Sequence, residues 1–498
     1  MPVDVTADPL ARSEAAMLAV AAYAGNGDGD AVAPVPAGGA AALGEALGID
    51  LAAELRTVGF SGNAGEVVRI PTRGAVAAST VVVVGLGAAD RLTTDGLRRA
   101  AAAVAGAAER VPSLATDLPA ALPDADPADA VAAVVEGISL GSYRFGTYRS
   151  EAPVHDLETT TLHLAEVDGA RDAVAVAEVA ARAARYARDL VNTPPQDKRP
   201  PALAQQVAEA FAGTDVAVRI LDEEALEAGG YGGILGVGRG SSEPPRLVEL
   251  TYAPEGAGRH VALVGKGITF DTGGISLKPS ESMETMKMDM AGAATVAAVV
   301  RAASELALPV KVTGLLALAE NMPSGTATRV SDVLTMKGGK TVEVINTDAE
   351  GRLVLGDALV HVCELQPDAI VDIATLTGAA VVALGEKIGV LMASDDDLAS
   401  RLLDAAKHTG EPFWQLPLAT EQYGDRLEGS IADLRNSGSR AAGTIFAGLF
   451  LHEFVADGIP WAHLDIAGVA WANEAAGYQG KGATGVPVRT LVRWLQAG

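Results

Sequence analysis

The chain has little of several features that define whole classes of protein. It has one cysteine, Cys363, in 498 residues, so no disulfide can form within it, and we expect a small buried thiol in a reducing compartment. No apolar run reaches the roughly 18 residues of a membrane-spanning helix. The first residues, MPVDVTADPL, carry acids where a secretory signal needs Lys or Arg, so we expect a cytoplasmic protein.

Basic side chains are also scarce. The chain has 38 Lys and Arg against 63 Asp and Glu, a formal net charge of −25. Such an excess disfavours binding to nucleic acid or to an anionic membrane, both of which need a basic surface. It also draws cations toward any cleft. We therefore expect no membrane partner and no nucleic-acid partner.

The order of strand-like and helix-like segments predicts an α/β fold. At 498 residues, two to three domains of roughly 150 residues each are expected. We predict an N-terminal α/β domain at 1–168, a connecting helix at 169–195 and a larger α/β domain at 196–498. The larger domain should hold a mixed, largely parallel sheet covered by helices. Its predicted strands are 217–221, 246–252, 260–265, 311–319, 341–345, 369–374, 388–393 and 462–466.

The stretch Asn346 to Leu353, reading NTDAEGRL, places two carboxylates two positions apart, at Asp348 and Glu350. In extended backbone alternate side chains share a face, so both acids should point at one spot, with Arg352 continuing the alternation. The preceding KTVEVI is typical of a strand, and the following residues are typical of a helix. The acids are therefore predicted near the carboxyl end of a strand, where open α/β sheets hold their ligands.

Two like charges this close repel each other unless a positive charge lies between them. A divalent metal is the obvious candidate, because carboxylate oxygens suit such cations. The alternative is a solvated acidic turn in which Asp348 caps the following helix. Acids and lysines elsewhere in the chain decide between the two.

Two further stretches carry charged residues among glycines and methionines. One reads VGKGITFDTGGISLKP and contains Lys266, Asp271 and Lys278, with glycines that let backbone approach a ligand closely. Ordinary salt bridges are the alternative for its two lysines. The other reads METMKMDMAG and places Asp289 just before a predicted helix at 291–305, where helix capping is the alternative role.

Two catalytic motifs are incomplete. The GxSxG at 137–141 follows a helix-like segment, whereas a nucleophile elbow needs a strand before it. His452 begins a sequence like HExxH, but Ala456 stands where the second histidine is required. Carboxylates must therefore provide most of any metal site.

Taken with the Met-rich segment around Asp289, NTDAEGRL and VGKGITFDTGGISLK resemble the leucyl aminopeptidase family, also called cytosol aminopeptidases. NTDAEGRL is very specific to that family. The likeness extends to EGISLGSYRF, RDLVNTP, ATLTGA and WAHLDIAG, while residues 1–130 match weakly. The resemblance implies a hydrolase that removes N-terminal residues from peptides, leucine and other apolar residues preferred, with 196–498 as its catalytic domain.

The resemblance also implies two divalent ions, Mn²⁺ or Zn²⁺, with Mg²⁺ or Co²⁺ as alternatives. The tighter site would comprise Lys266, Asp271, Asp289 and Glu350, and the exchangeable site would comprise Asp271, Asp348 and Glu350. Asp271 and Glu350 would therefore bridge the two ions. Lys266 can bind a metal only as a neutral amine, a form that an adjacent cation favours. Five residues would hold the ions: Lys266, Asp271, Asp289, Asp348 and Glu350.

By the same resemblance, Lys278 would polarise the scissile carbonyl, and Arg352 would hold a bicarbonate ion that serves as general base. The family typically has a methionine where Ala470 stands, so the pocket for the leaving residue should be wider here. Substrate would contact the main chain of Thr375, Leu376 and Gly378, and its first side chain would lie among Met286, Ala467 and Ala470.

Family members assemble as hexamers, so we expect a homohexamer that acts on peptides. Some bacterial relatives have a second role as regulators, so an aminopeptidase that is also a DNA-binding regulator is the alternative function. The net charge of −25 argues against it. An electrophoretic mobility shift at physiological salt separates the two.

Overall fold

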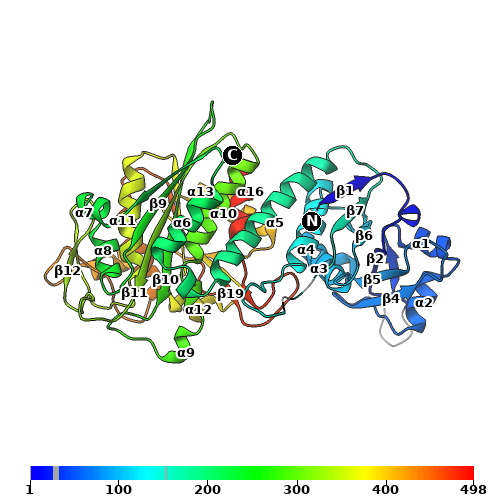
Figure 1. Cartoon of the computed structure of the whole chain (residues 1–498), viewed down its shortest axis with the longest axis horizontal. Coiled ribbons are helices and arrows are strands. Elements are labelled where there is room, and N and C mark those ends of the chain that lie inside the picture. Colours follow the sequence, from blue (N-terminus) through cyan, green and yellow to red (C-terminus); the bar gives the residue numbers. More distant parts are fainter. Residues whose placement is uncertain (1, 26–32, 152, 154) are drawn as a thin grey trace. The chain divides into compact units, whose positions relative to one another are not determined.

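The computed structural model describes residues 2–25, 33–151, 153 and 155–498 (Figure 1). It divides into two compact units. The first comprises residues 1–182, 408–410 and 474–481, and the second comprises 183–407, 411–473 and 482–498. Helix α5 (Ala170–Asn192) begins in the first unit and ends in the second.

The first unit is built on a mixed sheet in the order β1-β7-β6-β2-β5-β4, with β3 paired to β2. Strands β1, β7, β6, β2 and β5 run parallel, whereas β3 is antiparallel to β2 and β4 is antiparallel to β5. The bounds are β1 (Val3–Thr6), β2 (Met17–Tyr23), β3 (Val35–Ala37), β4 (Val67–Pro71), β5 (Thr80–Gly85), β6 (Ser113–Thr116) and β7 (Thr159–His163).

Helices cover both faces of this sheet, because alternate side chains of its central strands enter two different cores. Val82 and Val84 of β5 pack toward one core, and Val81 and Val83 pack toward the other. The first core includes side chains of α3 (Thr94–Ala107) and α4 (Pro127–Gly141), and the second includes those of α1 (Ala40–Leu47) and α2 (Leu51–Thr57). The GxSxG motif lies inside α4, as the sequence indicated.

The second unit contains an eight-stranded sheet in the order β16-β15-β18-β14-β10-β11-β9-β8. The four central strands, β18, β14, β10 and β11, are parallel, and β9 and β15 are antiparallel to their inner neighbours. The predicted mixed, largely parallel sheet is confirmed. The bounds are β8 (Val216–Leu221), β9 (Arg246–Tyr252), β10 (His260–Asp271), β11 (Lys311–Asn321), β14 (Ala369–Ala374), β15 (Gly389–Ala393), β16 (Phe413–Gln415) and β18 (Trp461–Asp465).

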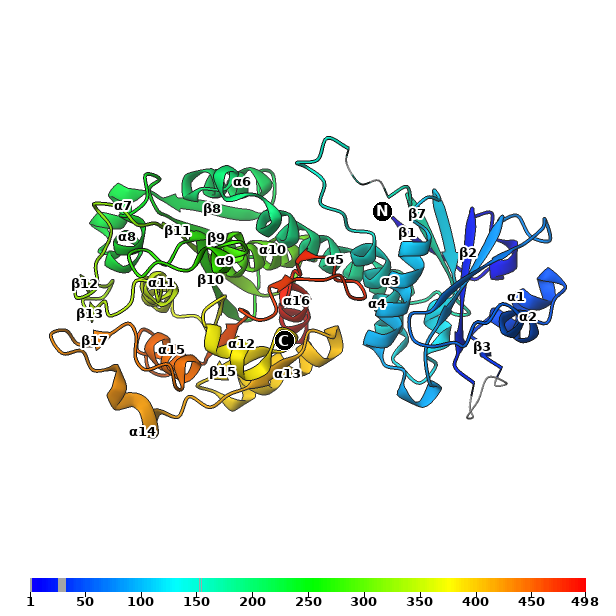
Figure 2. The ribbon, with the colours of Figure 1, turned by 90° about the horizontal axis from the view of Figure 1, so that it is seen from below.

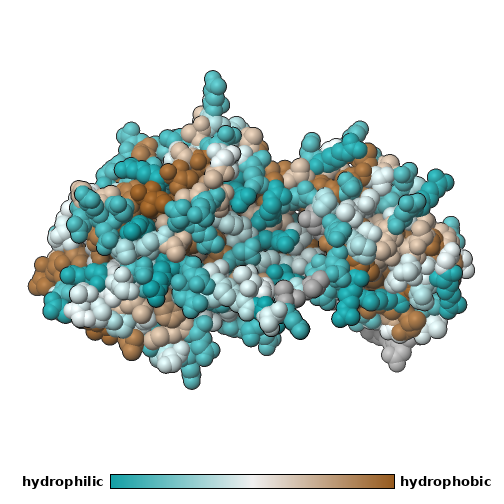
Figure 3. All heavy atoms as spheres, in the orientation of Figure 1, coloured by the Kyte–Doolittle hydropathy of each residue, from teal (hydrophilic) through white to brown (hydrophobic). Residues whose placement is uncertain are grey.

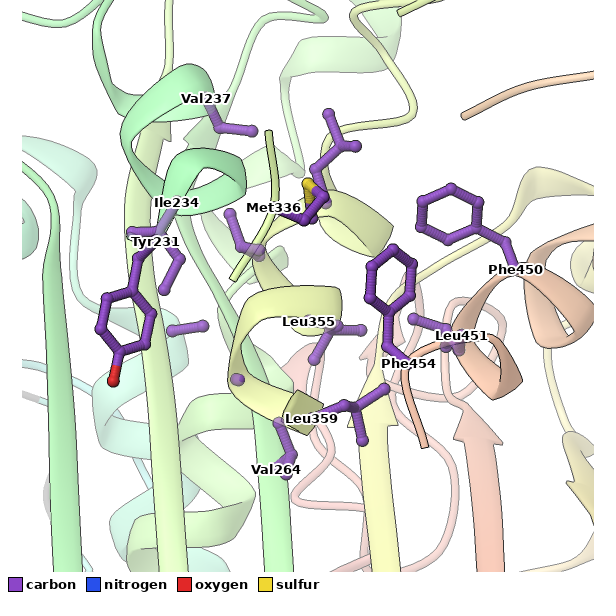
Figure 4. Close-up of a cluster of buried hydrophobic side chains, with 14 of the residues drawn as sticks. Tyr231, Ile234, Val237, Val264, Met336, Leu355, Leu359, Phe450, Leu451 and Phe454 are labelled. Carbon is purple, nitrogen blue, oxygen red and sulfur yellow. The ribbon is translucent and has the colours of Figure 1, made fainter. Parts of the chain in front are cut away.

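Helices α10 (Ala291–Glu305) and α11 (Gly351–Glu364) pack on opposite faces of β10. A Cβ added to Gly265 would lie 2.6 Å from the Cα of Ala293, so α10 approaches the sheet closely. On the other face, Val264 belongs to a large apolar cluster with residues of α8 (Gly232–Gly238), α11 and α15 (Gly443–His452). Figure 4 shows Leu355 and Leu359 of α11 within this cluster.

The strand predicted at 341–345 is shorter, and it lies outside the main sheet. It forms β13 (Thr341–Glu343), which pairs with β12 (Val333–Thr335) and β17 (Leu434–Arg435) in a separate three-stranded sheet. Strand β10, by contrast, continues to Asp271, well beyond its predicted end at residue 265. These two differences matter because both segments lead into the candidate site.

The remaining elements of the second unit connect these layers. They are η4 (Pro195–Asp197), α6 (Pro200–Ala210), α7 (Glu223–Ala228), α9 (Ser280–Met283), η5 (Met286–Met288), α12 (Gly378–Leu384), α13 (Asp396–Thr409), α14 (Thr420–Tyr423), η6 (Gly424–Leu427), β19 (Trp471–Ala472), β20 (Gly482–Ala483) and α16 (Val488–Ala497). Hydrophilic side chains are spread over the visible face of both units (Figure 3). None of the helices in the described ranges combines the length and the hydropathy of a membrane-spanning segment.

Candidate metal centre

Strand β10 places Lys266 beneath the start of helix α11. Side chains alternate along a strand, so Ala262, Val264 and Lys266 share the face that packs toward α11. Gly351 opens that helix, and a Cβ added there would lie 2.6 Å from Lys266 Cε. A glycine at this position is therefore what leaves room for the lysine.

The ammonium group of Lys266 is buried among acids. Its Nζ lies 2.9 Å from Asp289 Oδ2 and 2.9 Å from Glu350 Oε1, and it donates to the carbonyl oxygen of Thr375 at 2.9 Å. Only 3% of Lys266 is exposed. Burial lowers the pKa of Lys266, but the neighbouring carboxylates raise it more, so the net pKa shift is upward.

Three of the predicted acids converge. Asp271, Asp348 and Glu350 each offer a carboxylate oxygen, and these oxygens lie within 4.8 Å of one another. Lys278 Nζ lies 2.9 Å from Asp271 Oδ2 and also forms an ion pair with Asp348. Asp289 lies outside this triad but joins it through Lys266.

The convergence is as predicted, but the reason given for it is wrong. Glu350 has φ −78° and ψ −33° at the start of α11, so its backbone is not extended. Asp348 lies in a turn, and its backbone amide donates to Asn346 Oδ1 at 2.9 Å. Arg352 is already inside the helix. A turn followed by a first helical turn brings the side chains together, rather than the alternation of a strand.

The capping alternatives are also wrong. Helix α10 begins after Met290, which makes no side-chain cap, and Asp289 instead accepts from Thr375 Oγ1 at 2.6 Å. Helix α11 begins after Glu350, and Asp348 does not cap it. The salt-bridge alternative is present in part, because Lys266 and Lys278 both pair with acids of the group.

The electrostatics of the group favour additional positive charge. Four carboxylates face two ammonium groups, which leaves an excess of two negative charges when all are ionised. Burial raises the pKa of Asp289 to about 8 and that of Asp271 to about 6, despite the nearby lysines. Burial also raises the pKa of Glu350, but Lys266 and Lys278 lower it to a net value below its ordinary one.

The donor set fits divalent cations. Glu350 Oε2 is buried and has no hydrogen-bond partner among the described residues, although buried carboxylate oxygens are normally bonded. Carboxylate oxygens and an amine nitrogen suit hard or borderline metals. Bound cations would offset the excess charge that makes this group costly to bury.

Arg352 lies beside the acidic group, on the lining of the same cavity as Asp348. Its Nη1 donates to the carbonyl oxygen of Asn436 at 2.7 Å, and the guanidinium lies 5.7 Å from the ring centroid of Phe446. Its Nε is buried and has no hydrogen-bond partner in the described part of the chain. Burial lowers the pKa of Arg352 to about 10. The free N–H group of Arg352 could donate a hydrogen bond to a small oxyanion.

Two of the six predicted substrate contacts line a cavity beside the acids. Leu376 and Gly378 line a cavity of about 330 Å³ that also contains Asp348 and Arg352. Thr375 is buried and bonded to Asp289. The other three residues do not line this cavity. Met286 is half-buried in η5, Ala467 is half-buried after β18, and Ala470 is buried.

Four further residues position the site, and sequence reasoning missed them. Asn321 Nδ2 donates to Asp271 Oδ1 at 2.8 Å and to the carbonyl oxygen of Thr347 at 3.1 Å. Asn436 Nδ2 donates to the carbonyl oxygen of Asn346 at 2.7 Å. Asp465 accepts from the amide of Leu376 at 3.1 Å. Thr347 and Asp465 stand inside quoted motifs, but Asn321 and Asn436 lie outside them, so nothing in the sequence marked those two.

The fold and the site together define a class. Two α/β units, one of which places buried carboxylates and lysines at the end of β10 and the start of α11, are the features of a metal-dependent hydrolase. Comparisons with known proteins identify the family. The catalytic domain model of the cytosol aminopeptidase family matches residues 185–492, and the family's N-terminal domain model matches 29–152.

Relatives match over nearly the whole chain. A protein of Streptomyces avermitilis named probable cytosol aminopeptidase is 50% identical over 97% of this chain and 95% of its own length. A protein of the same name from Streptomyces coelicolor is 48% identical over 99% and 97%. The chain therefore belongs to the cytosol aminopeptidase family, and it is a metal-dependent aminopeptidase.

Solved structures of similar proteins also match nearly the whole chain. The bottromycin maturation enzyme BotP in complex with Mn is 40% identical and has a TM-score of 0.86, over 97% of this chain and 99% of that one. A mutant of tomato leucine aminopeptidase is 31% identical and has a TM-score of 0.87, over 100% and 96%.

Proposed function

We propose that the chain hydrolyses the first peptide bond of peptides at a centre of two divalent cations. The tighter site comprises Lys266, Asp271, Asp289 and Glu350, and the exchangeable site comprises Asp271, Asp348 and Glu350. The observation that carries the proposal is the triad of carboxylate oxygens within 4.8 Å of one another, next to a buried Glu350 oxygen that has no hydrogen bond. The Mn in the BotP structure supports the same chemistry.

When bound, the cations lower the pKa of water and act as Lewis acids, which is the chemistry that peptide hydrolysis needs. Lys278 donates to the carbonyl oxygen of the scissile bond and stabilises the negative charge that develops there. Its ion pairs with Asp271 and Asp348 hold the ammonium beside the triad. The exchangeable site, formed by Asp271, Asp348 and Glu350, would take the free α-amine of the substrate, so only peptides with a free N-terminus would be cleaved.

Arg352 would hold a bicarbonate ion, which would supply the general base for hydrolysis. The unpartnered buried Nε of Arg352 supports this role. The main chain of Thr375, Leu376 and Gly378 positions the peptide backbone. Asp465 keeps that segment in place, because it accepts from both the amide of Leu376 and the hydroxyl of Thr377.

The first side chain of the substrate lies among Met286, Ala467 and Ala470. Ala470 is smaller than the methionine that is typical of the family at this position, so the pocket has room for side chains larger than leucine as well as for leucine itself. The protein works as a homohexamer, in keeping with its family, and the names of its relatives support a cytoplasmic location. Light scattering of the purified protein would establish the number of subunits.

The experiment that tests the proposal is chelation followed by the return of single metals. We expect exhaustive chelation to abolish hydrolysis of leucine p-nitroanilide, and Mn²⁺ or Zn²⁺ to restore it. A panel of aminoacyl anilides then ranks the side chains accepted by the pocket. Undiminished hydrolysis by protein shown to be free of metal would refute the proposal.

A further inference from the structure

Two cavities adjoin beside the candidate metal centre. The first, of about 330 Å³, contains Asp348 and Arg352. The second, of about 550 Å³, is lined by apolar side chains that include Val382, Leu416 and Ile445. The two cavities adjoin, because four residues line both: Gly378, Ala379, Arg440 and Gly443.

The walls of the second cavity, which we call the apolar chamber, come from two packed helices. Val382 and Ala383 lie on α12, and Ile445 lies on α15. These helices contact each other, and Figure 2 shows them side by side. Val382 is 79% exposed, the highest exposed fraction among the large exposed apolar residues described. The chamber therefore presents apolar surface within reach of the metal centre.

Arg440 stands at the junction of the polar cavity and the apolar chamber. It is exposed, and it makes neither a hydrogen bond nor an ion pair with any residue that the structure describes. The other guanidinium of the first cavity, Arg352, is buried and held by Asn436. An unpaired guanidinium at such a junction suits a carboxylate, which it can bind through two parallel hydrogen bonds.

We propose that Arg440 binds the terminal carboxylate of short peptide substrates, and that the apolar chamber takes their apolar side chains beyond the scissile bond. The inference rests on the proposed function, because that function places the amino end of the substrate at the acids. Asp348 and Arg440 line the first cavity, and Arg440 also lines the chamber. The two volumes together accommodate a peptide of about three residues. Free apolar di- and tripeptides are thus the preferred substrates.

The test compares substrates that differ only at their carboxyl end. Trileucine has the carboxylate, its C-terminal amide lacks the charge, and leucine p-nitroanilide lacks the downstream residues. We expect Arg440→Ala to raise KM for trileucine by about threefold to tenfold, the effect of losing one partly exposed charge-assisted interaction. KM for the amide and for the anilide should change by less than about twofold. Arg329→Ala, at an exposed arginine paired with Asp332 and outside both cavities, is the matched control.

A second variant tests the chamber separately. Ala383→Trp should fill part of the chamber and raise KM for trileucine and for its amide alike, with little change for the anilide. Equal losses on trileucine and its amide in Arg440→Ala would overturn the carboxylate assignment. Unchanged peptide KM in both variants would overturn the proposal, and a changed subunit number as the sole effect would show that this surface contacts another copy of the chain instead. Wild-type protein inactive on the anilide would mark failure of the proposed function rather than of this inference.

Discussion

Two buried lysines of the second unit differ in what surrounds them. Lys198 has no exposed surface, and its Nζ donates to the carbonyl oxygens of Leu190, Val191 and Lys287 at 2.9, 2.7 and 2.8 Å. Lys266 is 3% exposed, and its Nζ faces two carboxylates and one carbonyl oxygen. One lysine is solvated by neutral dipoles, whereas the other lies among charges.

The pKa values of the two lysines shift in opposite directions. Burial and the charge of Lys287 lower the pKa of Lys198 well below its ordinary value. Burial also lowers the pKa of Lys266, but the nearby acids reverse the shift. Lys198 donates to two carbonyl oxygens at the end of α5 and to that of Lys287 in η5, which ties the end of α5 to the segment that leads to Asp289. Lys266 only partly neutralises a group of acids, and the remaining negative charge favours binding of a metal cation. Buried charge alone therefore does not indicate function, whereas an unbalanced excess of acid does.

The largest expected effect comes from removing Glu350, an acid beside Lys266 that both proposed cation sites share. Glu350→Ala should lower Mn²⁺-dependent hydrolysis of leucine p-nitroanilide by about 10³-fold or more, because two proposed cation sites lose a shared ligand. Circular dichroism should show an unchanged fold. Near-normal turnover by this variant would refute the site assignment.

Lys266→Met should destabilise the metal-free protein, because it leaves buried carboxylates without their partner. We expect a loss of about 3–5 kcal/mol in the free energy of unfolding, measured by denaturant titration. Mn²⁺ should recover much of that loss, since a bound cation replaces the missing charge. A loss that Mn²⁺ does not reduce would mean that the acids hold no metal in this variant.

Lys198→Met is the control for Lys266→Met, because it removes a buried lysine that has no carboxylate beside it among the described residues. It leaves three buried carbonyl oxygens without donors, so we expect a loss of about 3 kcal/mol or more in the free energy of unfolding. Mn²⁺ should recover none of this difference, because no excess of negative charge is created. Equal recovery of the Lys198 and Lys266 variants by Mn²⁺ would erase the distinction between the two sites.

Lys278 tests whether a less buried lysine of the same acidic group acts on substrate. Lys278→Ala should lower kcat by about 10²-fold, the usual effect of losing one donor to a developing oxyanion. Steady-state kinetics on leucine anilides at saturating Mn²⁺ measures it. If only KM changes, Lys278 binds substrate without stabilising the transition state.

A third buried cation, His463, has one carboxylate and should show the smallest effect. His463 Nδ1 lies 2.5 Å from Asp372 Oδ1, and both residues are fully buried. Burial lowers the pKa of His463, but Asp372 raises it to a net value above the ordinary 6.5. The pair therefore stabilises the fold fully below pH 6.5 and loses this contribution as pH rises through the folded-state pKa.

Stability measured against pH checks this prediction. His463→Gln should cost more stability at pH 6 than at pH 9, as measured by denaturant titration at both values. A cost that is the same at both pH values would show that the histidine is neutral throughout.

The sequence predicted most of the framework of the second unit. The predicted strands at 246–252 and 369–374 and the helix at 291–305 have the observed bounds, because continuous apolar runs and small-residue helices are strong local patterns. Strand β10 was predicted too short, because Gly265, Lys266 and Gly267 interrupt its apolar run. The two glycines pack closely against α10 and β11, and the strand continues through them.

The site was predicted less completely than the framework. The convergence of Asp271, Asp348 and Glu350 was confirmed, but the backbone that brings them together is a turn and a helix start, which alternation in sequence does not reveal. Asn321 and Asn436 contact the site from segments distant in sequence. Such contacts depend on tertiary packing, and a single sequence carries no local sign of them.

Anomalous diffraction from crystals grown with Mn²⁺ tests the central claim most directly. We predict two manganese peaks per subunit, among the side chains of Lys266, Asp271, Asp289, Asp348 and Glu350, and none beside Lys198. Crystals that show no manganese between those acids, or manganese bound elsewhere in the chain, would contradict the account.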